Sequence, residues 1–242
     1  MTVARADERR SDPGHHVSRR ASEPTRRRLI LTAPRPEASI ALLAGLAYAA
    51  LLAGKLAGVV NLSAGELVVI ALRLIVPFLI FRYWLVGGVA AMLLDACDVI
   101  LVDLMGLGGF GSHYAQLDKV LDSYYYVFEL VVALRWQNPW MRIPAAVLFV
   151  HRIVGAVLFE ALGIRALLFV FPNLFENWWL YCVVVTRWFP AYVPTGWKNT
   201  LVPLALLLAP KLAQEYLLHV FEAKPWNWTK AHILEPLGVL LK

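Results

Sequence analysis

Four aspartates in an otherwise apolar part of the chain are spaced as two pairs. Asp95 and Asp98 are three residues apart, and Asp118 and Asp122 are four residues apart. On an α-helix, either spacing places the two side chains on one face. The glycine-rich stretch 106–111 separates the pairs, so we expect two antiparallel neighbouring helices whose four carboxylates converge.

Carboxylates in such a group repel one another strongly unless a positive charge lies between them. A divalent cation, or two, would remove this repulsion. Oxygen ligands without histidine or cysteine at matching spacing favour Mg²⁺, Mn²⁺ or Ca²⁺ over zinc. We therefore predict metal binding at the four aspartates, with Mg²⁺ or Mn²⁺ as the expected ion. The alternative is that some aspartates lie in solvated loops or cap helices, and Asp103 is the best candidate for that.

Long apolar segments must position these residues. The chain has 242 residues, of which 60% are hydrophobic and 17% are charged, and its mean hydropathy is +0.61. Soluble domains carry about 25% charged residues, so these values exclude a disordered chain, a coiled coil and an ordinary soluble enzyme. The two cysteines, Cys97 and Cys182, are too few for a disulfide-rich scaffold or a cysteine-based zinc site.

Seven segments reach, or nearly reach, the length of about 20 mostly apolar residues that a membrane-spanning helix needs. We predict an all-α polytopic integral membrane protein, with six or seven transmembrane helices bundled into a single domain over residues 37–242. Short turns connect the helices. The predicted spans are 38–60, 67–81, 85–107, 115–136, 143–163, 166–189 and 201–221.

Residues 1–36 form an arginine-rich tail that we predict to be disordered. The tail holds nine arginines and four acidic residues, and so accounts for nearly all of the net charge of +6. Arginines beside an apolar segment favour the cytoplasmic face and anionic lipids. We therefore place the tail in the cytoplasm, beneath a bacterial inner membrane. Nucleic-acid binding is the competing interpretation, and we do not expect it because no folded basic module accompanies the tail.

The number of spans decides on which side of the membrane the aspartates lie. If all seven segments span, the tail shares one face with the basic residues of the turns, and the aspartates lie toward the other face. If 38–60 instead lies along the interface or re-enters, six spans remain, and the tail and the aspartates are both cytoplasmic. The basic residues in question are Arg82, Arg135, Arg142, Arg187 and Lys198.

Charged residues in the later segments are further candidates for a functional role. Arg152, in the middle of a predicted span, could hold a lipid phosphate in bidentate fashion, or could pair with Glu160 or Glu129. Lys211 and Glu215 are one helical turn apart, so we expect them to neutralise each other. Aromatic residues near the turns fit the membrane interface; they include Trp136, Trp140, Trp188, Trp197, Trp226 and Trp228.

The two aspartate pairs resemble the signature of the CDP-alcohol phosphatidyltransferase family. That signature reads D-x-x-D-G-x-x-A-R, then a short spacer, then G-x-x-x-D-x-x-x-D. In this chain 94–98 (LDACD) and 113–122 (HYAQLDKVLD) carry the aspartates, and 71–78 (ALRLIVPF) is similar to the family's first helix. The likeness covers residues 61–135.

The chain departs from this signature at positions that face the nucleotide in the family. Val99 stands where the signature has glycine, and Val102 where it has alanine. Asp103 replaces the arginine of the first motif, and Tyr114 replaces the glycine of the second. In the family the first glycine lets the nucleotide lie close to the backbone, so Val99 bears directly on whether a CDP group can bind.

The resemblance implies a membrane-embedded phosphotransferase of phospholipid synthesis. Such an enzyme transfers a phosphoalcohol or phosphatidyl group from a CDP-linked donor to a hydroxyl acceptor, so its partners are that donor and membrane lipids. Two ions, Mg²⁺ or Mn²⁺, would bind to the four aspartates, and Asp122 would also act as the catalytic base. Arg152 is the candidate for substrate binding. A homodimer is compatible with this interpretation.

Two other classes of function stay open. A non-catalytic relative could keep the membrane scaffold, and a metal, as a lipid-binding or partner subunit. A small transporter could use the carboxylates as a path for cations. Metal bound at Asp95, Asp98, Asp118 and Asp122 would favour the enzyme over the non-catalytic relative.

Overall fold

The computed structural model describes residues 63–106 and 114–236, and every regular element in these two ranges is a helix. The prediction of an all-α fold is therefore confirmed. The arginine-rich tail, the predicted span 38–60 and most of the turn at 106–111 lie outside the described residues.

Five helical segments of the described ranges are long and apolar enough to cross a membrane, which supports a membrane protein. Two of them are interrupted, and each therefore consists of two helices. The segments are Ala64–Arg82 (α3, Ala64–Ile75, and α4, Phe78–Arg82), α5 (Trp84–Met105), α7 (Pro139–Leu162), Ala166–Trp188 (α8, Ala166–Val170, and α9, Leu174–Trp188) and α10 (Trp197–His219).

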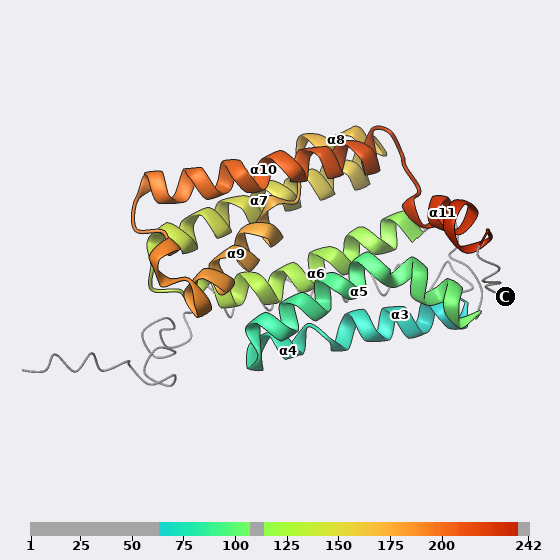
Figure 1. The fold of residues 1–242 in the computed structure, drawn as a ribbon, viewed down its shortest axis with the longest axis horizontal. Helices are drawn as coiled ribbons and strands as arrows, with labels where there is room; N and C mark the ends of the chain where they lie inside the picture. Colours follow the sequence, from blue (N-terminus) through green and yellow to red (C-terminus); the bar gives the residue numbers. More distant parts are fainter. Residues whose placement is uncertain (1–62, 107–113, 237–242) are drawn as a thin grey trace, which may run out of the picture.

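The predicted segment 115–136 forms the central helix of the bundle, α6 (Tyr114–Leu134), and is not among these five. α6 packs against α3, α4, α5, α7 and α9, and Figure 1 shows it running through the middle of the bundle. Every residue from 120 to 133 is buried. Because protein surrounds α6 on most sides, this helix can carry polar residues that a lipid-facing helix could not.

Local sequence signals set the helix ends. The Ser63 hydroxyl accepts from Glu66 N at 3.1 Å, while Ser63 N donates to the Glu66 carboxylate at 2.8 Å, a capping box at the start of α3. Gly106 ends α5 and Gly163 ends α7, with φ of 61° and 68° in the left-handed region. These signals fix how far Asp95 and its neighbours lie from the end of the bundle.

The interruption between α8 and α9 brings three helices together. Pro172 follows α8, and two backbone groups beside it, Phe171 O and Asn173 N, bond to side chains instead of within a helix. Arg152 Nη1 of α7 donates to Phe171 O at 3.0 Å, and Asn173 N donates to Glu215 Oε1 of α10 at 3.0 Å. A broken helix inside a membrane needs such partners for its free backbone groups.

One aromatic residue assigned to the interface belongs to the core instead. Trp136 is 1% exposed and lies in the main hydrophobic cluster, because it directly follows the central helix. Trp140, Trp188, Trp197 and Trp228 are exposed, as the interface interpretation requires.

Candidate functional site

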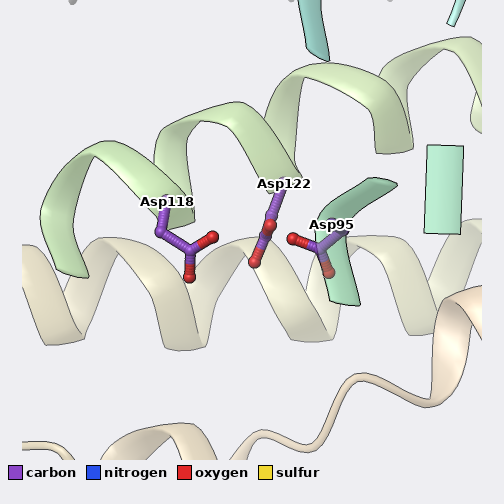
Figure 2. Close-up of side chains that lie close together, drawn as sticks. All are labelled: Asp95, Asp118 and Asp122. Atoms are coloured by element: carbon purple, nitrogen blue, oxygen red, sulfur yellow. The ribbon is translucent and has the colours of Figure 1, made fainter. Parts of the chain in front are cut away.

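The two aspartate pairs come together between α5 and α6. One carboxylate oxygen each from Asp95, Asp118 and Asp122 can be chosen so that all three lie within 4.8 Å of one another. Figure 2 shows these carboxyl groups pointing toward one another, two from α6 and one from α5. Asp98 is 2% exposed and is joined to these three aspartates through a hydrogen bond from Arg73.

A guanidinium group lies among the four carboxylates. Arg73, in the last turn of α3, donates from Nη1 to Asp98 at 2.8 Å and to Asp118 at 2.7 Å. From Nη2 it donates to Asp95 and Asp122, both at 2.5 Å. Arg73 is 3% exposed, so these charge-assisted bonds are shielded from water and fix both aspartate pairs relative to α3.

Lys119 is the second cation at this point. Its Nζ lies 2.8 Å from Asp118 Oδ2 and 2.9 Å from Asp122 Oδ2. Together Lys119 and Arg73 balance two of the four aspartate charges. One divalent cation would balance the remaining two. We call these six residues the aspartate cluster: Arg73, Asp95, Asp98, Asp118, Lys119 and Asp122.

The chemistry of the cluster fits a small divalent ion, although with fewer free ligand atoms than the resemblance implies. Asp95, Asp118 and Asp122 offer closely spaced carboxylate oxygens of the kind that Mg²⁺ and Mn²⁺ prefer. One oxygen of each of these aspartates already accepts a hydrogen bond from Arg73. The second oxygens of Asp118 and Asp122 accept from Lys119. Both the charge and the remaining oxygens suit one ion better than two.

Asp103, the remaining aspartate of α5, is separate from the cluster. Its Oδ2 accepts from Trp226 Nε1 and from Lys230 Nζ, each at 2.7 Å. Trp226 belongs to α11 (Pro225–Thr229), so Asp103 ties the segment after α10 to the end of α5. Asp103 is thus neither a loop residue nor a cap, but a docking point for α11.

A polar cavity of about 350 Å³ adjoins the cluster. Asp95, Lys119 and Asp122 form its wall on the side of the cluster, and Arg152 comes from α7. We did not predict a cavity, because its other polar residues come from α6, α9 and α10, and the sequence does not show that these helices meet. They are Tyr126, Asn173, Glu176, Asn177, Lys211, Gln214, Glu215 and His219.

Arg152 is buried in the wall of this cavity, with 3% of its surface exposed. Its Nη1 donates to the Phe171 carbonyl, and among the described residues no carboxylate forms an ion pair with it. The predicted alternative of a pair with Glu129 is wrong, because both Glu129 oxygens lack a hydrogen-bond partner. Glu215, Asp122 and Glu176 line the same cavity and act on Arg152 electrostatically without forming an ion pair with it. A buried guanidinium that faces a cavity can donate directly to an anionic ligand.

A network on α10 closes the far side of the cavity. Glu215 lies 3.4 Å from Lys211 Nζ, which confirms the predicted pair, and 3.1 Å from His219 Nε2. His219 is four residues after Glu215, so helical spacing could have revealed it as a second partner. The contact of Glu215 with Asn173 N depends on the break before α9 and has no signal in the sequence.

Comparison with known proteins identifies no relative of this chain. No family model, no curated protein and no solved structure matches it. The resemblance to the CDP-alcohol phosphatidyltransferases therefore rests only on the aspartate spacing and on residues 71–78, so the functional argument depends on the geometry of the cluster and its cavity.

Proposed function

We propose that the protein is a membrane-embedded, metal-dependent phosphotransferase that acts on a CDP-linked donor and a hydroxyl acceptor in lipid synthesis. One observation carries this proposal: carboxylates suited to a divalent ion and a buried arginine that forms no ion pair among the described residues line the same cavity. Phosphoryl transfer needs positive charges beside the transferring group and the leaving group, because both are negative. It needs little covalent participation of the protein.

Three roles follow for the residues of the cluster and the cavity. A divalent ion held by Asp95, Asp118 and Asp122 would neutralise charge on the diphosphate of the donor. Arg152 would donate to a phosphate oxygen and so orient the phosphorus for attack by the acceptor. Asp122, which is 3% exposed in the cavity wall, would take the proton from the acceptor hydroxyl as its oxygen bonds to phosphorus and the bond to CMP breaks.

We further propose that α6 is a sixth span, beside the five apolar ones. It has 21 residues, enough to cross a bilayer, and its charged residues face neighbouring helices or the cavity. With α6 spanning, the ends of α5 and α10 lie on the side of the aspartate cluster, and the start of α10 lies on the other side (Figure 1). Use of a CDP-linked donor requires the cluster to face the cytoplasm.

Cysteine labelling tests this orientation. In a variant with Cys97 and Cys182 replaced by alanine, Glu222→Cys probes the end of α10 near the cluster, and Lys198→Cys probes its start; both positions are exposed. In intact cells, an impermeant maleimide should label position 198 and reach position 222 only after permeabilisation. The reverse pattern would exclude a cytoplasmic donor.

Activity tests the proposed base. Purified protein supplied with Mg²⁺ or Mn²⁺ should release CMP from a CDP-linked lipid when a hydroxyl acceptor is present. Asp122→Asn should reduce the rate by about 10²–10⁴-fold, the usual contribution of a positioned base. The matched control is Asp103→Asn, which changes an aspartate outside the cluster and should retain activity. Equal rates for Asp122→Asn and wild type would remove Asp122 from this role.

Arg73 favours a second candidate function, that of a non-catalytic lipid-binding or partner subunit. It bonds to all four aspartates, so the cluster is held together by protein groups alone. Val99, which is 38% exposed, also fills space that the family leaves to the nucleotide. In this case Mn²⁺ should leave the thermal unfolding temperature unchanged, and folded wild type should release no CMP with any acceptor. A metal-dependent enzyme should instead unfold at a higher temperature with Mn²⁺.

A further inference from the structure

Lys119, on α6, binds the two carboxylate oxygens that Arg73 leaves free on that helix. Arg73 donates to Oδ1 of Asp118 and to Oδ1 of Asp122. The Lys119 ammonium group takes the other oxygen of each, with Nζ 2.8 Å from Asp118 Oδ2 and 2.9 Å from Asp122 Oδ2. A divalent ion that uses this second pair of oxygens has to approach the position that Lys119 occupies.

The ammonium group and a metal ion compete for these oxygens. Mg²⁺ bonds to carboxylate oxygens at about 2.0–2.1 Å, so an ion on either Oδ2 would lie less than about 5 Å from Nζ, the sum of the two contact lengths. A unit positive charge at this distance repels a divalent cation strongly. Binding of the metal ion is therefore linked to the departure of the Lys119 ammonium group.

The side chain of Lys119 can make this movement. Adjacent residues of a helix project about 100° apart, so the contact with Asp118 depends on bending of the lysine stem and not on helical register. The stem has four carbons and rotates freely. Lys119 lines the polar cavity together with Arg152, and its side chain is 15% exposed. The cavity of about 350 Å³ provides the space that a released ammonium group needs.

We propose that Lys119 is a tethered counter-ion of the aspartate cluster, which a divalent cation displaces from Asp118 and Asp122 into the cavity. This inference rests on the proposed function, because it requires the cluster to bind a metal ion. Before the metal ion binds, Lys119 and Arg73 hold the carboxylates together. Afterwards the released ammonium group joins Arg152 in the cavity, where both cations can donate to phosphate groups of the donor. Lys119 thus becomes a substrate-binding residue only once the metal ion is in place.

The Mn²⁺ affinity of the full chain in phosphatidylcholine nanodiscs tests the displacement, with free Mn²⁺ followed by electron paramagnetic resonance. Lys119→Met keeps a side chain of similar length and removes the competing charge, so it should bind Mn²⁺ about tenfold more tightly than wild type, or more tightly still. Lys211→Met is the matched control, because Lys211 lines the same cavity but pairs with Glu215. Its affinity should differ from wild type by less than about twofold, since its charge does not contact the aspartates.

Since a variant can fail to fold, wild-type protein provides a second measurement. Reductive methylation with formaldehyde modifies accessible lysine amines, and mass spectrometry locates the methyl groups. Added Mg²⁺ should raise the methylation of Lys119 several-fold, because the amine leaves its two carboxylates for the cavity. The methylation of Lys211 should stay unchanged, because its pair with Glu215 does not involve the metal ion.

The outcomes separate this inference from the proposed function. Equal Mn²⁺ affinities of wild type and Lys119→Met, or methylation of Lys119 that Mg²⁺ leaves unchanged, would refute the displacement while the metal site stands. A comparable gain of affinity in Lys211→Met would also refute it, because any cation of the cavity would then act alike. If neither wild type nor Lys119→Met binds Mn²⁺, the metal site is refuted, and the proposed function fails together with this inference.

Discussion

Two acids on the central helix are equally buried but differ in what surrounds them. Asp122 is 3% exposed and contacts two cations, Arg73 and Lys119. Glu129, two turns further along α6, is 0% exposed and contacts no cation in the part of the chain that the structure describes. Depth in the bundle is the same, so depth does not decide the charge of these acids. The difference lies in the cations that α3 and α6 supply to Asp122 and that no described residue supplies to Glu129.

Arg152 extends this comparison to a buried cation. Among the described residues it forms no ion pair, although acids of the same cavity act on it. Arg152 lines the cavity and Glu129 does not. A guanidinium cannot discharge itself by losing its proton, whereas a carboxylate can be neutralised by gaining one. The arginine therefore has to face the acids of the cavity, water or an anion, while an acid without a partner can lie in a closed apolar environment.

The largest expected effect comes from removing the cation of the aspartate cluster. Arg73→Leu leaves four carboxylates with Lys119 alone, and breaking a buried pair in this way costs about 3–5 kcal/mol of unfolding free energy. Equilibrium unfolding in detergent measures the loss. Arg165→Leu is the matched control, because its pair with Glu222 is exposed and contributes only about 0–1 kcal/mol.

Added Mn²⁺ tests whether the destabilised variant binds a metal ion. If the cluster binds a divalent ion, Mn²⁺ should recover part of the stability that Arg73→Leu loses, since it restores positive charge among the carboxylates. A variant as stable as wild type without added metal would show that Arg73 does not hold the aspartates in the folded protein.

The second prediction compares the two acids directly. Glu129→Leu removes a buried polar group that has no partner, so it should raise the unfolding free energy by about 1–3 kcal/mol. Asp122→Leu should lower it, because Arg73 and Lys119 each lose a contact. Thermal unfolding of the two variants against wild type provides the test. Destabilisation by Glu129→Leu would mean that Glu129 has a partner and is not a free acid.

The sequence was sufficient to predict the features that follow from spacing. Helical periodicity placed Asp95 with Asp98 and Asp118 with Asp122, and a glycine turn made the two helices neighbours, so their convergence could be anticipated. Hydropathy likewise predicted the all-helical fold. It also predicted a span at 115–136, but α6 is not among the five helices apolar enough to cross a membrane, because it carries four charged residues. That α6 packs against five other helices is a property of the tertiary structure.

Long-range contacts could not be predicted from one sequence. Arg73 lies 22 residues before Asp95 and 49 before Asp122, and nothing in its local pattern indicates that it points at them. A charge in an apolar segment was the available signal, and it suggested a partner without naming one. The cavity depends in the same way on the break at Pro172, which joins α7, α9 and α10.

The third prediction concerns Arg152. Since Arg152 forms no ion pair among the described residues, Arg152→Met should change the unfolding free energy by only about 1 kcal/mol in either direction. Removal of a buried charge offsets the lost bond to Phe171 O. The same variant should lose any rise in unfolding temperature that wild type shows with a phosphate-bearing lipid. Arg142→Met, at the other end of α7, should keep it. An unchanged response in Arg152→Met would separate Arg152 from the ligand.

The smallest expected effect is at Asp103. This carboxylate is 36% exposed and its partner Lys230 is 32% exposed, so water screens the pair. Asp103→Asn keeps an oxygen that can accept from Trp226 and loses only the charge, so the unfolding free energy should change by less than about 1 kcal/mol. Limited proteolysis after α10 gives a more sensitive measurement, because weaker docking of α11 should speed cleavage there before the bundle unfolds. A loss of stability as large as that of Arg73→Leu would mean that exposed and buried aspartates of α5 contribute alike, which contradicts the contrast in burial on which the other predictions rest.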